Sequence, residues 1–190
     1  MSLAQSIVSA AMVAQTLRMA VPYACAALGG VWSEKSGVVN IALEGGLLVS
    51  GLSAVACAHA TGSTWLGLAG GIVAGALLAA THALVVVLGR VDAIVSGIAL
   101  NLVAAGGTRF VLRALYHSSS NSPAVEGFRF GALEGASGAK LLARTLLDPT
   151  TLLTVAIAFG SAWLLSRTRF GLRVRAVGED PVAASTVGVP

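Results

Sequence analysis

Long, continuously apolar runs alternate with short polar joints along the chain. Between Gly45 and Gly89 there is no Asp, Glu, Lys or Arg. Because one helical crossing of a bilayer takes roughly 20 residues, that run can cross twice. Strands of a β-barrel would instead alternate apolar and polar residues. The pattern predicts an all-α, polytopic helical membrane protein with about five membrane-spanning segments, at residues 5–30, 38–60, 66–89, 93–115 and 148–166.

The polar joints divide the chain into two regions. Residues 1–166 are expected to form a transmembrane helical bundle, with a long outer loop at 116–147 that is rich in Ser, Gly, Asn and charge. Residues 167–190 are expected to form a cytoplasmic loop that ends in a short helix at about 177–189. Polar stretches of this kind must lie outside the hydrocarbon, because their backbone and side chains need water.

Composition supports the membrane assignment and excludes a nucleic-acid partner. Hydrophobic residues make up 56% of the chain and charged residues 11%, against about 25% charged in an ordinary soluble domain. The mean hydropathy is +0.85 and the pI is near 9.7. The net charge of +4 comes from basic residues at segment ends, and aromatic residues are only 5% of the chain. The expected environment is therefore the lipid bilayer, with no nucleic acid bound.

The arginines predict the orientation of the chain in the membrane. Four of them lie between Arg167 and Arg175, and such clusters remain on the cytoplasmic side. Counting back by pairs of crossings places Arg90 and then Lys35 on the same side. The N-terminus and the 116–147 loop then face outward. Arg18 falls near the middle of the first segment, where a charge is costly unless it is paired or hydrated.

Two polar side chains open the segment at 38–60. Asn40 and Glu44 are four residues apart, so on a helix they would share one face. An ionisable residue inside an apolar segment indicates a functional site by default. The structural alternative is that Glu44 pairs with Arg18 or a neighbouring helix and only holds the bundle together. Asn101 lies deep in a later segment, where it either lines a polar path or forms a hydrogen bond between helices.

Other residues have packing roles as their simplest interpretation. Gly67, Gly71 and Gly75 place small residues on one helix face, which lets membrane helices approach closely. His59 and His82 are isolated, which favours polar contacts between helices or a place at the membrane interface. Their spacing indicates no metal or catalytic role.

Several catalytic motifs are absent or misplaced. Cys25 and Cys57 lie in apolar segments and are expected to be buried free thiols. Ser137 stands in a Gly-Ala-Ser-Gly string that matches a nucleophile motif of intramembrane proteases, but the string lies in the polar loop. Neither Lys35 nor Lys140 completes a Walker A loop. We therefore predict no catalytic, cofactor-binding or metal-binding residue, so any ATP must be bound by a partner subunit.

Four stretches of the sequence resemble permease subunits of bacterial ABC importers. The similarity is to the branched-chain amino acid/ribose type and, within it, to the nucleoside and simple-sugar permeases. Its most specific string is Ser-Glu-Lys-Ser-Gly-Val-Val-Asn-Ile-Ala-Leu-Glu-Gly at residues 33–45. The four stretches are residues 16–22, 29–46, 91–110 and 170–178.

The resemblance implies a multi-pass subunit of the bacterial plasma (inner) membrane that works with partners. These are a second permease subunit (a second copy or a related chain), cytoplasmic ATP-binding subunits and an extracytoplasmic substrate-binding protein. The helix at 177–189 would be the coupling helix that docks on the ATPase. The alternative for that helix is a surface helix on lipid headgroups. The coupling residues implied are Gly178, Glu179, Ala183, Ala184 and Gly188.

We therefore predict a transporter subunit rather than an enzyme, which couples ATP hydrolysis by a partner to import of nucleosides or simple sugars. Asn40, Glu44 and Asn101 are the candidates for the translocation pathway. The alternative is an ion- or proton-coupled secondary transporter, for which only Glu44 supplies a carboxylate at membrane depth. An intramembrane enzyme would need a catalytic pair that the sequence lacks. Family members usually continue further, so we expect this chain to be the N-terminal part of a longer permease fold.

Overall fold

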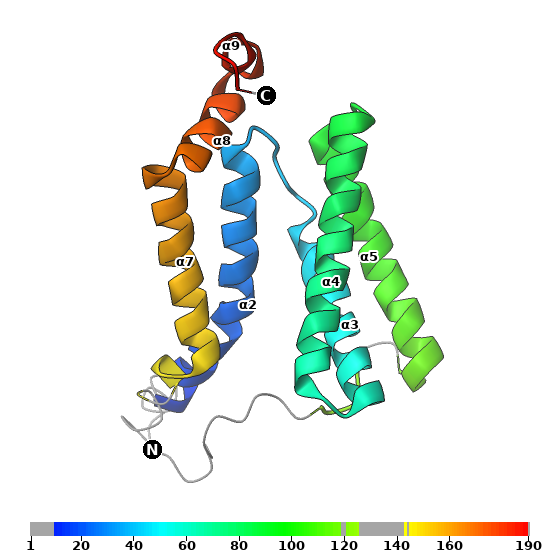
Figure 1. Ribbon diagram of the computed structural model, residues 1–190. Coiled ribbons are helices and arrows are strands. Elements are labelled where there is room, and N and C mark those ends of the chain that lie inside the picture. The colour runs from blue at the N-terminus through cyan, green and yellow to red at the C-terminus, as the bar shows by residue number, and fades with distance from the viewer. Residues whose placement is uncertain (1–9, 119–120, 126–142, 144, 190) are drawn as a thin grey trace, which may run out of the picture. The chain divides into compact units, whose positions relative to one another are not determined.

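The computed structural model describes residues 10–118, 121–125, 143 and 145–189, and the regular elements of these residues are all helical (Figure 1). The helices are α2 (Ala10–Lys35), α3 (Leu43–Thr61), α4 (Thr64–Ala83), the π-helical turn η1 (Leu84–Leu88), α5 (Ala93–Tyr116), α7 (Pro149–Arg167), α8 (Arg169–Glu179) and α9 (Pro181–Thr186).

Among the described residues, four helices are long and apolar enough to cross a membrane. They are α3, α4 continued by η1, α5 and α7, and they match the last four predicted segments. This confirms a polytopic helical membrane protein. Helix α2 has 26 residues, carries Arg18 and continues through Pro22, but it is not one of the four. The fifth crossing therefore stays a prediction.

The chain divides into two compact units. One comprises residues 1–31 and 129–190, and thus contains most of α2 together with α7, α8 and α9. The other comprises residues 32–128 and contains α3, α4, η1 and α5. We call them the outer-sequence unit and the central unit, because the second lies between the two parts of the first along the sequence.

Small residues bring α3 and α4 together in the central unit. Gly67 and Gly71 are buried. A Cβ atom at Gly67 would lie 2.6 Å from the Ala58 Cβ, and one at Gly71 would lie 3.0 Å from the Ala54 Cβ. A side chain at either glycine would therefore crowd α3. The predicted packing role is confirmed for Gly67 and Gly71, whereas a Cβ atom at Gly75 would lie at an ordinary contact distance, 3.5 Å from the Ser50 Cβ.

Helices α3 and α5 run side by side in the same direction. At one end Gly45 of α3 bonds to Asn101 of α5. Towards the other end the rings of His59 and Tyr116 meet edge to face, with centroids 5.6 Å apart. His59 thus contacts a neighbouring helix, by an aromatic rather than the predicted polar contact. Asp92 is the N-cap of α5, and its Oδ1 accepts hydrogen bonds from the Ile94 and Val95 amides at 2.9 and 3.1 Å.

In the outer-sequence unit, α2 meets α7 where the Cys25 Sγ lies 3.5 Å from the Thr154 Oγ1. Both cysteines of the chain are free thiols, as predicted, but the expected burial is wrong: within the chain Cys25 is exposed and Cys57 is half-buried. Large apolar side chains on the membrane-crossing helices of both units point outward. Phe110 and Phe159 are each 74% exposed within the chain. Apolar surface on this scale suits contact with lipid or with further helices rather than with water.

Candidate functional site

Helix α7 turns sharply into α8 at Thr168. The backbone there is extended, with φ −111° and ψ 157°, so the two helices are separate. The Thr168 Oγ1 accepts a hydrogen bond from the Gly171 amide at 3.1 Å and donates one to the Leu164 carbonyl at 2.5 Å. One hydroxyl thus bonds to the last turn of α7 and to the first turn of α8, which defines the corner between them.

Gly171 lets the start of α8 press against the end of α7. It is buried, and a Cβ atom added to it would lie 2.5 Å from the Leu165 Cα. The obstacle is backbone, so rotation of a side chain cannot relieve it. Leu165 itself is only 8% exposed. The direction in which α8 leaves α7 is therefore fixed by direct contact of the two backbones.

The segment predicted as one helix at 177–189 is in fact divided at Asp180. Helix α8 ends at Glu179, and Asp180 has φ −152° and ψ 101°. Its Oδ1 accepts hydrogen bonds from the Val182 and Ala183 amides at 2.9 and 3.0 Å, and Pro181 occupies the first helical position of α9. Asp as N-cap followed by Pro is a strong helix start, so a new helix begins here.

Gly188 ends α9 with a left-handed backbone conformation, at φ +78°. The Val189 amide donates to the Ala184 carbonyl and the Gly188 amide donates to the Ser185 carbonyl, both at 3.1 Å. This pair of bonds is the Schellman arrangement, which favours glycine because L side chains resist positive φ. The glycine in the predicted coupling motif therefore has a structural reason to be there.

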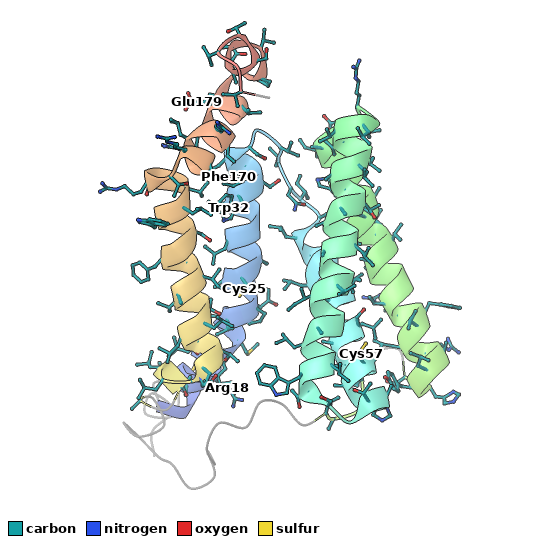
Figure 2. The ribbon with its side chains drawn as sticks, viewed as in Figure 1. Arg18, Cys25, Trp32, Cys57, Phe170 and Glu179 are labelled. Carbon is teal, nitrogen blue, oxygen red and sulfur yellow. The ribbon has the colours of Figure 1, made fainter. Side chains whose placement is uncertain are left out.

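The five predicted coupling residues divide into exposed and supporting positions. Glu179, at the end of α8 (Figure 2), and Ala183 are exposed. Ala184 is only 4% exposed, and Gly178 is half-buried. A docking partner can thus reach Glu179 and Ala183, whereas Ala184 packs inside the chain and Gly188 shapes the backbone.

At the start of α3 the structure corrects one prediction. The helix begins at Leu43 rather than near residue 38, so Asn40 precedes it and does not share a helix face with Glu44. The cause is local: the Asn40 Oδ1 accepts a hydrogen bond from the Ala42 amide at 2.9 Å, a turn that competes with helix. Glu44 is exposed in the first turn of α3, where a negative charge is favourable.

Asn101 of α5 bonds to the backbone at this same point. Its Oδ1 accepts from the Gly45 amide at 2.7 Å, and its Nδ2 donates to the Ile41 carbonyl at 2.9 Å. Of the two roles predicted for Asn101, the hydrogen bond to a neighbouring segment is present. Its place in a pathway stays a prediction.

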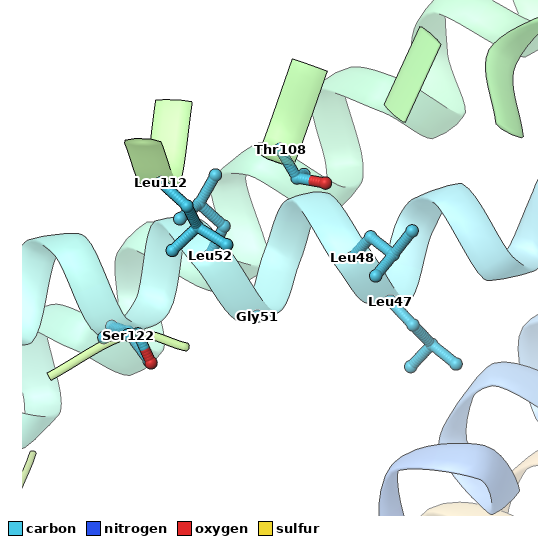
Figure 3. Close-up of a pocket in the computed structure, with 8 residues that line it drawn as sticks. Leu47, Leu48, Gly51, Leu52, Thr108, Leu112 and Ser122 are labelled. Carbon is cyan, nitrogen blue, oxygen red and sulfur yellow. The ribbon is translucent and has the colours of Figure 1, made fainter. Parts of the chain in front are cut away.

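A groove of about 330 Å³ lies between α3 and α5 (Figure 3). Glu44 and Asn101 belong to the two helices that line the groove, and neither is one of its lining residues. Its lining residues are Leu47, Leu48, Gly51, Leu52, Val55, Thr108, Leu112 and Ser122.

Two features were not predicted from the sequence. The corner residues Thr168 and Gly171 were missed, although a Thr directly before a helical run is a recognisable N-cap signal. The partner of His82 was also missed: its Nδ1 lies 3.0 Å from the Ser96 Oγ. The predicted polar contact of His82 is thus present, but no spacing rule points from residue 82 to residue 96.

The structure tests only some of the motifs that were discounted from the sequence. In the part of the chain that the structure describes, no group of three or more His, Cys, Asp or Glu side chains is placed to hold a metal ion. Ser137 and Lys140 lie outside the described residues.

Taken together, the apolar helices and the capped corner define a polytopic membrane protein with a helical pair, α8 and α9, attached to one of its spanning helices. The family "Branched-chain amino acid transport system / permease component" matches residues 12–190. The chain belongs to this family, as the resemblance implied. Its family and its four apolar helices make it a multi-pass protein of the inner membrane.

The chain is similar to several curated proteins that are named as ABC transporter permeases. The guanosine ABC transporter permease protein NupQ of Bacillus subtilis is 37% identical over 183 residues, which are 92% of this chain and 57% of the relative. The nucleoside ABC transporter permease protein NupC of Lactococcus lactis is 33% identical, over 93% of this chain and 58% of the relative. The putative glucose ABC transporter permease protein TsgC13 of Haloferax volcanii is also 33% identical, over 92% and 54%.

The chain thus spans little more than half the length of the curated relatives it matches. No solved structure matches it.

Proposed function

We propose that this chain is a membrane-spanning permease subunit of an ATP-driven importer for nucleosides or simple sugars. ATP would be bound and hydrolysed by cytoplasmic partner subunits. A second permease subunit and an extracytoplasmic substrate-binding protein would complete the importer. Family membership and the names of the curated relatives support this reading.

The corner from α7 through α8 to α9 is the observation that carries the proposal. Thr168 and Gly171 join α8 firmly to the end of an apolar spanning helix. Asp180 and Gly188 then define both ends of α9. A partner that moves α9 would therefore move α7, because neither junction contains a flexible linker. Such a lever is what coupling an ATPase to a membrane path requires.

The docking surface would consist of the exposed side of the α8–α9 pair. Glu179 and Ala183 are exposed there, whereas the four arginines begin the segment and end at Arg175. In the proposed topology this arginine cluster keeps α8 and α9 on the cytoplasmic side, where the ATP-binding subunits are. A small, acidic tip fits a groove of a protein partner better than an anionic lipid surface.

The translocation pathway would run along α3 and α5. Asn40 and Glu44 lie at the start of α3, where the Asn101 side chain bonds to the backbone, and α3 and α5 also line the groove of Figure 3. A few polar groups together with an apolar groove suit a substrate that has hydroxyl groups and a flat or compact apolar surface. Nucleosides and simple sugars both have this chemistry.

Replacing Glu179 and Gly188 in the assembled importer, reconstituted in liposomes, tests the coupling role. We expect Glu179→Gln and Gly188→Ala each to reduce substrate-stimulated ATP hydrolysis, because the first changes the docking surface and the second strains the end of α9. Gly62→Ala is the matched control for the second: Gly62 also has positive φ, +66°, and also ends a helix, but it lies at the far end of α3.

The control should have the same backbone cost, about 1 kcal/mol, without loss of coupling. Equal coupling in wild type, Glu179→Gln and Gly188→Ala would contradict the docking role. Uptake that stops when the proton gradient and membrane potential are collapsed, while ATP is still present, would instead indicate a secondary transporter.

A further inference from the structure

Residues 36–42 form a non-helical connection between α2 and α3, directly before a helix that is apolar enough to cross a membrane. Backbone outside a helix is tolerated at membrane depth only if its polar groups are satisfied by protein or water. Part of this segment satisfies itself: the Ser33 Oγ donates to the Val38 carbonyl at 2.7 Å, and the Val38 amide donates to the Ser33 carbonyl at 3.2 Å.

Asn101 supplies bonds at the end of the segment, where the chain becomes helical. Its side-chain amide has one acceptor and one donor end, and both are used. The acceptor takes the Gly45 amide at 2.7 Å and the donor reaches the Ile41 carbonyl at 2.9 Å. These two backbone groups lie on either side of the first helical residue, Leu43. The Asn101 side chain of α5 thus bonds to the backbone on both sides of the residue at which α3 begins.

Around these two hydrogen bonds, α5 and the start of α3 pack too closely for a side chain at two glycine positions. A Cβ atom at Gly45 would lie 2.9 Å from the Asn101 Oδ1 and 3.0 Å from the Ala104 Cβ. A Cβ atom at Gly97, one turn before Asn101, would lie 2.9 Å from the Ile41 Cβ. Helix α5 therefore touches the segment on both sides of the hydrogen bonds, and the register between them is fixed by shape as well as by bonding.

The two bonded backbone groups are immediate neighbours of the two other pathway candidates. Ile41 follows Asn40, and Gly45 follows Glu44. Asn40 is half-buried and Glu44 is exposed, so both can face a pathway, whereas the amide of Asn101 is occupied by backbone. We propose that Asn101 is a positioning residue, which sets the orientation of Asn40 and Glu44 without contacting substrate itself. This inference rests on the proposed function of the chain.

The test compares three variants of the assembled importer. Asn101→Leu removes both hydrogen bonds at similar volume, and Asn101→Asp keeps an acceptor for the Gly45 amide but loses the donor. Thr108→Val is the matched control for the exchange measurement alone, because Thr108 also lines the groove and its replacement could alter uptake. Thr108 lies on the same face of α5 and is 7% exposed, and its hydroxyl donates to carbonyls of its own helix, those of Ala104 and Ala105.

Hydrogen–deuterium exchange of a peptide covering residues 38–46 is the first measurement. We expect the exchange rate to rise about fivefold in Asn101→Leu, because two hydrogen bonds between membrane segments are lost. A smaller rise is expected in Asn101→Asp and none in Thr108→Val. Exchange of an α4 peptide should stay unchanged in all three variants. Unchanged exchange of residues 38–46 in Asn101→Leu would overturn the proposal.

Uptake of radiolabelled guanosine, with glucose as the comparison, is the second measurement. The apparent KM should rise in the same order as exchange, Leu above Asp above wild type, because misplaced Asn40 and Glu44 weaken recognition. A raised KM without faster exchange would make Asn101 a substrate ligand and overturn the positioning role. Faster exchange with unchanged KM and Vmax would overturn the link to the pathway.

The exchange measurement needs no substrate, so the two ideas can fail separately. If the wild-type importer takes up neither probe in an ATP-dependent way, the proposed function fails. Exchange in Asn101→Leu would still decide whether Asn101 holds the start of α3.

Discussion

In the central unit, polar side chains bind across helices: Asn101 of α5 holds the start of α3, and His82 of α4 meets Ser96 of α5. In the corner from α7 to α9, polar side chains bind the backbone beside them, since Thr168 and Asp180 each cap the helix that follows. Polar side chains thus fix the register between helices in one region and the direction of the chain in the other.

Solvent explains this difference. Inside the hydrocarbon a polar side chain has no water to bind, so a partner on another helix is the available alternative. At the membrane surface water competes, and a cap next to its own helix costs the least entropy to form. Under the proposed function, the central unit would maintain a defined pathway and the corner would transmit a movement.

The largest effect is expected from a substitution that forces α8 away from α7 at the corner. Gly171→Val would place a side chain against the Leu165 backbone, where a Cβ atom is already 2.5 Å away. We expect α8 to tilt away from α7, with a loss of more than about tenfold in substrate-stimulated ATP hydrolysis, equal to 1.4 kcal/mol or more of lost coupling. Gly160→Val on α7, which meets open space, should leave hydrolysis and coupling intact. Equal activity in the two variants would contradict a rigid corner.

An effect of intermediate size, on stability rather than on coupling, is expected in the central unit. Gly67→Val overfills the contact between α3 and α4, where a Cβ atom would lie 2.6 Å from the Ala58 Cβ. Overpacking costs about 1–3 kcal/mol, which should lower the thermal unfolding midpoint of the purified complex. Gly106→Val in α5, where nothing lies within 4 Å of the added Cβ, is the control.

The comparison predicts that Gly67→Val alters stability without uncoupling. The ratio of substrate transported to ATP hydrolysed should stay at the wild-type value, in contrast to Gly171→Val. If Gly67→Val uncoupled the importer as strongly as Gly171→Val, the two regions would not have separate roles.

The smallest effect is expected at the bond between His82 and Ser96. A double-mutant cycle of His82→Ala and Ser96→Ala, read from unfolding in detergent, should give a coupling free energy of about 0.6 kcal/mol, the average for hydrogen bonds between membrane helices. A coupling free energy of zero would show that the 3.0 Å contact between His82 and Ser96 does not stabilise the protein.

The features that depend on the sequence of a single element could be predicted. Composition and spacing within one element are enough to indicate the four spanning helices, the packing glycines at 67 and 71, and the cap at Asp92. The late start of α3 was harder to predict, because the turn of Asn40 competes locally with helix and the Ile41 carbonyl bonds to Asn101, 60 residues away along the chain. The pairing of His82 with Ser96 likewise depends on how two helices meet.

For the candidate site, the sequence predicts the helical segment beyond the last spanning helix but not its division. The proposed coupling residues lie on the pair α8 and α9, whereas the pattern predicts one helix at 177–189. An Asp-Pro pair after a helix is a signal for a new helix start, and that prediction places the pair inside the helix. For Asn101 the residue type predicts a polar role, but its backbone partners on a distant segment depend on how α5 meets the start of α3.

Cross-linking of adjacent positions on α9 tests the central claim most directly. In a Cys25→Ala, Cys57→Ala background, Ala183→Cys and Ala184→Cys would each be paired with single cysteines on the ATP-binding subunit of the assembled importer. Ala183 is exposed and Ala184 is 4% exposed, so the account predicts an efficient cross-link from position 183, altered by ATP, and none from 184. Failure at 183, with cross-links to the ATPase from Val91→Cys in the central unit instead, would contradict it.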